Sequence, residues 1–166
     1  MKFYKNKKIL FRFDAGEFDG FGHLKRTEPL INFLISKGFN VIICTNSKTK
    51  NFLNKNLKNK IYFIKKKKES EEKYLNRISD NFNGYIIVID KLYNYRKKEI
   101  NDLKKKNEVI FIQNYSSGAK ISNKIIFPDD HNFMQKKKNI YTGSKYLVLR
   151  DEISKIKKIE NKNCLA

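Results

Sequence analysis

Short apolar segments alternate with longer amphipathic segments along most of this chain, and that alternation limits the folds open to it. The apolar segments with the length and composition of β-strands are residues 8–13, 40–45, 61–64, 84–90, 109–112 and 124–127. The segments expected to be helical are residues 22–37, 47–57, 69–81 and 95–106. Repeated strand–helix alternation predicts an α/β fold with a Rossmann-like, doubly wound parallel sheet and right-handed crossovers.

Local signals mark several of these boundaries. Gly38 follows the first helical segment and is expected to end it, and Ser47 is a candidate N-cap for the second. Glu69 stands four residues before Lys73, the spacing at which opposite charges pair on a helix. Segment 84–90 is apolar on both faces, which is typical of a central parallel strand.

Polar residues follow two of the predicted strands, where doubly wound sheets bind ligands. Asp90 ends the fourth strand, and Gly20, Gly22 and His23 lie between the first strand and its helix. A helix N-terminus attracts anions, glycine lets a ligand approach the backbone, and histidine moves protons near neutral pH. The pattern predicts an active-site loop, with a purely structural histidine as the alternative. It is not the dinucleotide fingerprint, because Lys25 occupies the third glycine position.

The formal net charge of +20 comes almost entirely from lysine. Lysine runs at 65–68, 104–106 and 136–138 lie between apolar segments, as solvated loops and faces do. Specific nucleic-acid contacts favour arginine and stacked aromatic rings, and the chain has only five arginines. We therefore predict no specific nucleic-acid partner, only a weak and salt-sensitive attraction to polyanions.

The short apolar runs and the spacing of the two cysteines argue against a membrane protein, a secreted protein and a disulfide- or metal-based fold. No apolar run approaches the roughly 20 residues of a membrane span, and the basic N-terminal segment lacks the apolar core of a signal peptide. We predict a soluble, cytoplasmic protein. Cys44 and Cys164 show neither metal-ligand spacing nor a disulfide framework. We assign His131 to a loop after Pro128 rather than to a metal cluster, and predict no metal and no cofactor.

Two separated motifs resemble a known family. The first is Arg12-Phe13-Asp14 followed by Gly20-Phe21-Gly22-His23-x-x-Arg26, and the second is Gly143-x-x-Tyr146-x-x-Leu149-Arg150-x-Glu152. They are similar to motifs of the UDP-2,4-diacetamido-2,4,6-trideoxy-altropyranose hydrolases of pseudaminic acid biosynthesis. That family is close to the spore-coat polysaccharide protein G group and related to B-type glycosyltransferases.

The resemblance implies a fold, a reaction and a set of site residues. The fold is the N-terminal half of a B-type glycosyltransferase, and the reaction is cleavage of the bond between the anomeric carbon and the UDP oxygen by water, with inversion. His23 resembles the catalytic base, since a neutral imidazole accepts a proton from water near neutral pH. The substrate-binding residues that we assign with it are Arg12, Asp14, Gly20, Gly22, Arg26, Asp90, Tyr146 and Arg150. For Arg12 and Asp14 we favour a mutual ion pair that shapes the loop, and for Arg26 contact with a phosphate or a carboxylate, or a plain helix-surface position.

The chain also departs from that family. Its members have two domains and the second supplies most of the nucleotide site, whereas here residues 1–150 form the predicted catalytic domain and residues 151–166 look like the start of an interdomain connection. Gln113-Asn114 stands where the family often has an acidic pair. Either a separate chain completes the enzyme, or the product is truncated and inactive, and alone it should bind UDP poorly. Two other functions stay open: a subunit of a B-type glycosyltransferase, and a non-catalytic module that binds a partner or a polyanion.

Overall fold

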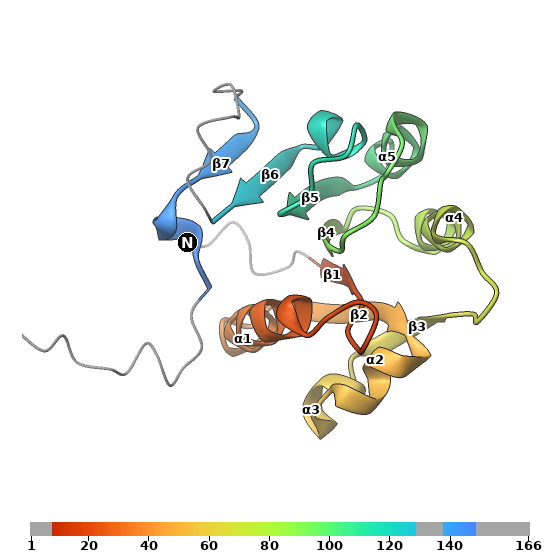
Figure 1. Cartoon of the computed structure of the whole chain (residues 1–166), viewed down its shortest axis with the longest axis vertical. Helices are drawn as coiled ribbons and strands as arrows, with labels where there is room; N and C mark the ends of the chain where they lie inside the picture. The colour runs from red at the N-terminus through yellow and green to blue at the C-terminus, as the bar shows by residue number, and fades with distance from the viewer. Residues whose placement is uncertain (1–7, 129–137, 149–166) are drawn as a thin grey trace, which may run out of the picture.

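Seven parallel strands form one sheet in the computed structural model, which describes residues 8–128 and 138–148 (Figure 1). The strands are β1 Lys8–Phe13, β2 Asn40–Asn46, β3 Ile61–Lys65, β4 Ile86–Asp90, β5 Glu108–Ile112, β6 Lys124–Phe127 and β7 Ile140–Thr142. Their order across the sheet is β3-β2-β1-β4-β5-β6-β7, and each neighbouring pair is parallel. The first six strands were predicted from the sequence, whereas β7 was not.

The strand order reverses direction at the centre of the sheet. From β1 the chain builds outward to β2 and β3, then crosses back to place β4 on the other side of β1 and continues outward to β7. This is the doubly wound, Rossmann-like arrangement that the alternation of segments predicts. The carboxyl ends of β1 and β4 flank the reversal, with Phe13 opposite Asp90 in the register. A crevice for ligands is expected at that point.

Helices cover both faces of the sheet (Figure 1). They are α1 Gly22–Ser36, α2 Ser47–Phe52, α3 Lys55–Lys58, α4 Glu71–Asn81 and α5 Lys97–Lys104, with 3₁₀ turns η2 Ala119–Ile121 and η3 Ser144–Tyr146. Successive strand residues point to opposite faces. Leu10 therefore packs in the cluster formed with α4 and α5, whereas its neighbour Phe11 packs in the cluster formed with α1 and α3. Two buried faces account for the continuously apolar central strands.

Three local predictions were wrong. Asn46, not Ser47, caps α2, because its side chain accepts a hydrogen bond from the Thr49 N–H at 2.8 Å. The single helix expected over 47–57 divides into α2 and α3, because Leu53 is extended and Asn54 starts a new cap. Glu69 lies before α4 and does not pair with Lys73.

The other predicted strands and helices agree with the observed elements to within two residues at each end, and some predictions fall outside what the structure describes. Glu69 pairs instead with Arg77, at 2.7 Å, and Gly38 ends α1 with a positive φ of 83°. Arg150, His131 and the segment 151–166 lie outside the described residues. In the described part of the chain, no helix has the length and apolar character needed to cross a membrane.

Candidate active site at the centre of the sheet

Three side chains that the sequence singles out meet at the carboxyl ends of β1 and β4. His23 and Arg26 lie one turn apart on α1 and so share a face of that helix. Asp90 is the last residue of β4 and is completely buried. The parallel sheet places the start of α1 against the end of β4, so residues 64 to 67 positions apart in sequence form hydrogen bonds.

His23 is oriented by Asp90. The Nδ1 atom of His23 lies 2.7 Å from Oδ1 of Asp90, and His23 is only 8% exposed. An ionised carboxylate only accepts hydrogen bonds, so Nδ1 carries the proton and Nε2 presents a lone pair. No described residue forms a hydrogen bond with Nε2. In the described part of the chain every buried side-chain nitrogen has a hydrogen-bond partner, so a nitrogen without one, such as Nε2, is not buried. Nε2 therefore opens toward solvent, as a group that accepts a proton from water must.

Arg26 holds the carboxylate of Asp90 from the other side. Its Nε donates to Oδ2 at 2.8 Å and its Nη2 donates to Oδ1 at 2.6 Å, a two-pronged geometry that fixes the carboxylate plane. Its remaining nitrogen, Nη1, donates to the side-chain oxygen of Gln113 at the end of β5. Arg26 is therefore not a plain surface residue of the helix. The carboxylate that it binds belongs to the protein itself.

A second ionic cluster lies beneath the loop that leads from β1 to α1. Arg12 is fully buried and binds Asp14 through two nitrogens, both at 2.7 Å, which confirms the predicted pair. It also binds Glu71 of α4, at 2.9 and 2.6 Å. Tyr95 donates to the same Glu71 carboxylate at 3.2 Å. Arg12 has no exposed surface, so its contacts shape the loop from below.

Asp14 connects this cluster to the loop. It accepts hydrogen bonds from the Lys91 ammonium at 2.7 Å and from the Asn46 backbone N–H at 2.8 Å. Burial by itself would raise the pKa of the Asp14 carboxyl, but the charges and hydrogen bonds of Arg12 and Lys91 outweigh it and lower that pKa well below its ordinary value. Lys91 also reaches Asp19 at 3.1 Å. These bonds tie the loop after β1 to the end of β4.

Glycines shape the same loop. Gly16 and Gly20 pair across it, with the Gly20 N–H donating to the Gly16 carbonyl at 2.7 Å. Gly20 has a φ of 74°, a conformation that favours glycine. Gly22 is the first residue of α1 and has open space where a Cβ would stand. The predicted glycines therefore lie at the turn that delivers His23, and their backbone is accessible there.

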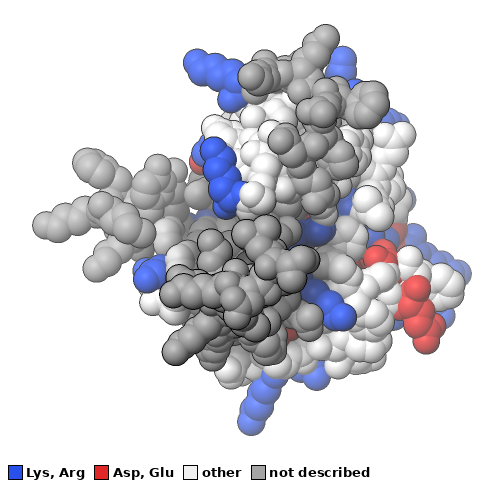
Figure 2. Space-filling view, turned by 60° about the vertical axis from the view of Figure 1, so that its left-hand side comes forward, with Lys and Arg blue, Asp and Glu red and all other residues white. Residues whose placement is uncertain are grey.

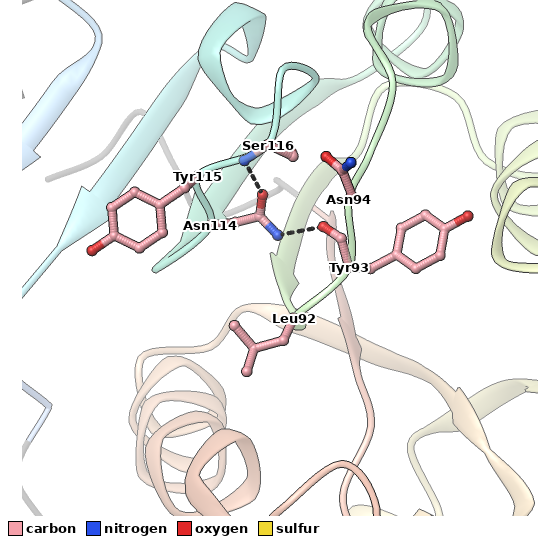
Figure 3. Close-up of a pocket in the computed structure, with 6 residues that line it drawn as sticks. All are labelled: Leu92, Tyr93, Asn94, Asn114, Tyr115 and Ser116. Atoms are coloured by element: carbon pink, nitrogen blue, oxygen red, sulfur yellow. Dashed lines mark hydrogen bonds between the residues drawn. The ribbon is translucent and has the colours of Figure 1, made fainter.

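An open pocket of about 430 Å³ lies between the loops that follow β4 and β5, close in sequence to Asp90 and Gln113 (Figure 3). Its lining residues are Leu92, Tyr93, Asn94, Asn114, Tyr115 and Ser116. Asn114 joins the two loops, since its Nδ2 donates to the carbonyls of Lys91 at 2.9 Å and Tyr93 at 3.0 Å. In Figure 3 the side chains of Asn94 and Ser116 face each other across the gap between the loops. The pocket wall is thus mostly aromatic and amide, with no ionised side chain among these lining residues.

Of the second sequence motif, the structure describes residues 143–148, which follow β7 at one side of the sheet. Tyr146 is in η3 after β7, where its ring contacts Tyr141 with centroids 5.9 Å apart. β7 is three strands from β4, or ~14 Å at the usual strand spacing. The structure therefore brings His23, Arg26 and Asp90 together but leaves Tyr146 at the edge of the sheet.

Sequence reasoning missed three residues of the site: Glu71, Lys91 and Gln113. Lys91 and Gln113 each follow the end of an apolar strand, and that position was a usable signal. Glu71 carried none, because a glutamate in the first turn of a helix is ordinarily solvated. Its burial depends on α4 crossing back over β1.

Metal-binding and thiol chemistry have little support in the described residues. Those residues contain no group of three His, Cys, Asp or Glu side chains placed to hold a metal ion. Burial raises the pKa of the Cys44 thiol to about 12, and nearby positive charge offsets only part of that rise. Cys44 is therefore a core residue rather than a nucleophile.

The chain was compared with family models, with curated proteins and with solved structures, and none of them matches it. Its function is therefore inferred from the geometry of the site and from the motif resemblance.

Proposed function

We propose that this chain is the catalytic N-terminal domain of a cytoplasmic nucleotide-sugar hydrolase, in which His23 activates water. The observation that carries the proposal is the His23–Asp90 pair at the crossover of the sheet, with Nδ1 held at 2.7 Å and Nε2 open. The motif resemblance supplies the substrate class, a UDP-linked diacetamido-trideoxy sugar. No metal or cofactor is needed for this reaction.

The chemistry follows from the tautomer that Asp90 imposes. Nε2 takes a proton from a water molecule as the water oxygen forms a bond to the anomeric carbon, and the bond from that carbon to the diphosphate oxygen breaks. UDP leaves with the bonding electron pair, and His23 becomes an imidazolium. The buried Asp90 carboxylate stabilises that cation through Nδ1, as a positioned carboxylate does in other histidine-based sites. Attack opposite the leaving group gives inversion at the anomeric carbon.

The division of labour in the site follows from its charges. Each guanidinium nitrogen of Arg26 already donates to Asp90 or Gln113, so at most one N–H on Nη1 and one on Nη2 are left for a diphosphate. The adjacent pocket offers aromatic and amide groups, which suit sugar C–H faces and hydroxyls. In this proposal the described domain therefore holds the sugar, and a separate chain or domain binds the UDP portion.

Exposed apolar side chains support the proposal that a partner binds where the carboxyl ends of the strands lie. Of the nine large hydrophobic residues that are exposed in the described part, seven lie within eight residues after the carboxyl end of a strand. They are Phe18, Phe21, Phe52, Leu92, Tyr93, Tyr115 and Leu147. Exposed apolar groups that gather on one side mark an interaction surface. Two of them, Phe21 and Phe52, already pack against each other with ring centroids 4.9 Å apart.

The test is release of UDP from the UDP-linked diacetamido sugar, measured with and without an added nucleotide-binding domain. Replacement of His23 by Ala should lower the turnover of an active assembly by about 10²–10⁴-fold, the usual contribution of a general base. Lys25→Ala is the matched control, because Lys25 is an exposed residue two positions along the same helix. Turnover that persists unchanged in His23→Ala rules out the assigned base.

A B-type glycosyltransferase subunit is the alternative that shares this site. The same base would then take the proton from an acceptor hydroxyl instead of from water. Analysis of the product separates the two, since hydrolysis leaves the sugar free and transfer leaves it on an acceptor. Stable binding of a partner without turnover of any sugar nucleotide would favour the non-catalytic module.

A further inference from the structure

We propose that Gln113 is a positioning residue for His23: it fixes the guanidinium of Arg26, which in turn fixes the carboxylate that selects the His23 tautomer. This inference rests on the proposed role of His23 as a base. It adds a residue from the turn directly after a third strand, β5, to a site otherwise formed by α1 and β4.

The hydrogen bonds form a chain in one direction. The side-chain oxygen of Gln113 accepts from Nη1 of Arg26, whose Nε and Nη2 donate to Asp90 at 2.8 and 2.6 Å. Asp90 then accepts from Nδ1 of His23 at 2.7 Å. Nη2 of Arg26 also lies 3.4 Å from Nδ1, but a protonated Nδ1 cannot accept from it. The position of Arg26 therefore decides which oxygen of Asp90 faces the imidazole.

The backbone at Gln113 indicates that its side chain is needed in this position. Gln113 has a φ of 48°, and among the described residues it is the one non-glycine with a positive φ. A residue with a Cβ is disfavoured in the left-handed region, and such outliers gather at functional sites. Its N–H donates to the Ile126 carbonyl of β6 at 2.9 Å, so the residue stays anchored to the sheet while the chain turns. The strained turn directs the amide toward Arg26.

If the Gln113 amide is removed, the guanidinium of Arg26 keeps only its two hydrogen bonds to the Asp90 carboxylate. Arg26 is partly exposed, with 19% of its side chain open to solvent, so it can swing about that carboxylate or turn Nη1 to water. The Asp90 carboxylate can then rotate, and its hydrogen bond with Nδ1–H of His23 is no longer fixed. In a neutral imidazole either nitrogen can carry the proton. A shift toward the Nε2–H form removes the lone pair that accepts a proton from water.

The experiment reads the tautomer of His23 directly, in the full chain, by nitrogen-15 NMR of the imidazole above its titration range. The chain has two histidines, so a His131→Asn background isolates the His23 signals. Wild type should show mainly the Nδ1–H form. Gln113→Ala and Gln113→Gly should both raise the Nε2–H fraction by about twofold or more, because each removes the amide oxygen.

The choice of variants separates the side chain from the backbone. Gln113→Gly relieves the left-handed strain, so it folds even if Gln113→Ala does not, and Gln113→Glu keeps an acceptor oxygen for Arg26. The proposal expects Gln113→Glu to retain the wild-type tautomer and Gln113→Gly to lose it. A Gln113→Gly protein with the wild-type tautomer ratio overturns the proposal, as does a Gln113→Glu protein that behaves like Gln113→Gly.

Kinetics give a second readout wherever turnover is measured. Gln113→Ala should lower kcat by about tenfold with KM changed by less than about twofold, since the interaction acts on the base and not on the bound sugar. The tautomer measurement needs no substrate. If the hydrolase assignment fails, the tautomer measurement still tests the role of Gln113. An unchanged tautomer ratio in Gln113→Gly rules out that role, whatever reaction the site performs.

Discussion

At the scale of single residues, the site depends on charges that are buried but matched. Arg12 and Asp90 are fully enclosed, and each is bound to partners of opposite charge through two-pronged contacts. An unpaired charge in such a place costs several kcal/mol, so removal of one partner is more harmful than the absence of both. Asp14 is the most connected of these groups, because Arg12, Lys91 and the Asn46 N–H all bind it.

Replacement of Asp14 by Asn should therefore lower the free energy of unfolding at pH 7 by about 3 kcal/mol. The cause is that Arg12 and Lys91 lose a carboxylate whose pKa is lowered by their charge despite its burial. A depressed pKa adds stability that is fully present above the unfolded value of about 3.9 and is lost as the pH falls toward the folded value. Urea unfolding of wild type and variant should thus differ most at pH 7, and the difference should shrink progressively below about pH 4.

The control for this pH effect is Glu17→Gln, on the same loop. Glu17 is exposed, and none of the hydrogen bonds or ion pairs between described residues involves its side chain. Its replacement should change the unfolding free energy by no more than about 0.5 kcal/mol, both at neutral pH and in acid. Equal losses of stability in Asp14→Asn and Glu17→Gln would contradict a special role for the buried pair.

At the scale of elements, the loop after β5 packs directly against α5 and against the residues that immediately precede α5. A Cβ added at Gly118 would lie 2.7 Å from Cγ1 of Ile100 and 2.9 Å from the carbonyl oxygens of Tyr95 and Arg96. The Gly118 N–H also donates to the Tyr95 carbonyl at 2.8 Å. Backbone from two loops therefore meets at a point where only glycine fits, and this contact fixes the wall of the pocket.

Gly118→Ala should consequently destabilise the fold by about 1–3 kcal/mol, the range for an overpacked core position. Thermal unfolding measures the change, and Gly22→Ala is the matched control because a Cβ there meets open space and φ is not positive. The control should be neutral or slightly stabilising at the start of a helix. A Gly118→Ala protein as stable as Gly22→Ala would show that the loop after β5 moves aside without cost.

At the scale of the whole molecule, the positive charge is spread and the site is electrically balanced. Figure 2 shows lysine and arginine side chains distributed over the visible surface rather than collected in one cluster. At the centre of the sheet, Arg26 is matched by Asp90, and Arg12 and Lys91 are matched by Asp14, Glu71 and Asp19. Within the described residues, the site therefore contributes little to the net charge of +20.

Binding to nucleic acid should therefore be non-specific and strongly salt-dependent. Fluorescence anisotropy with two labelled oligonucleotides of unrelated sequence should give equal affinities, each falling at least about tenfold between roughly 50 and 200 mM salt. Counterion release from dispersed lysines accounts for both properties. A preference for one sequence, or an affinity that survives about 200 mM salt, would instead point to an organised nucleic-acid site.

The sequence by itself determined the architecture, because apolar periodicity is a local property that each segment carries alone. The strands predicted at residues 8–13 and 124–127 have the same bounds as β1 and β6, and the alternation of segments is enough to predict a doubly wound sheet. The N-cap of α2 is harder to predict from the sequence. Asn46 and Ser47 both have side chains that cap helices well, and only the position at which β2 ends decides between them.

Only the tertiary structure decided how the site works. The sequence placed His23, Arg26 and Asp90 at one edge of the sheet, but their hydrogen bonds depend on how α1 lies against β4 and β5. Glu71 and Gln113 became part of the site through the crossover to α4 and the left-handed turn after β5. Contacts between residues far apart in sequence follow from packing the whole sheet, and no local pattern encodes them.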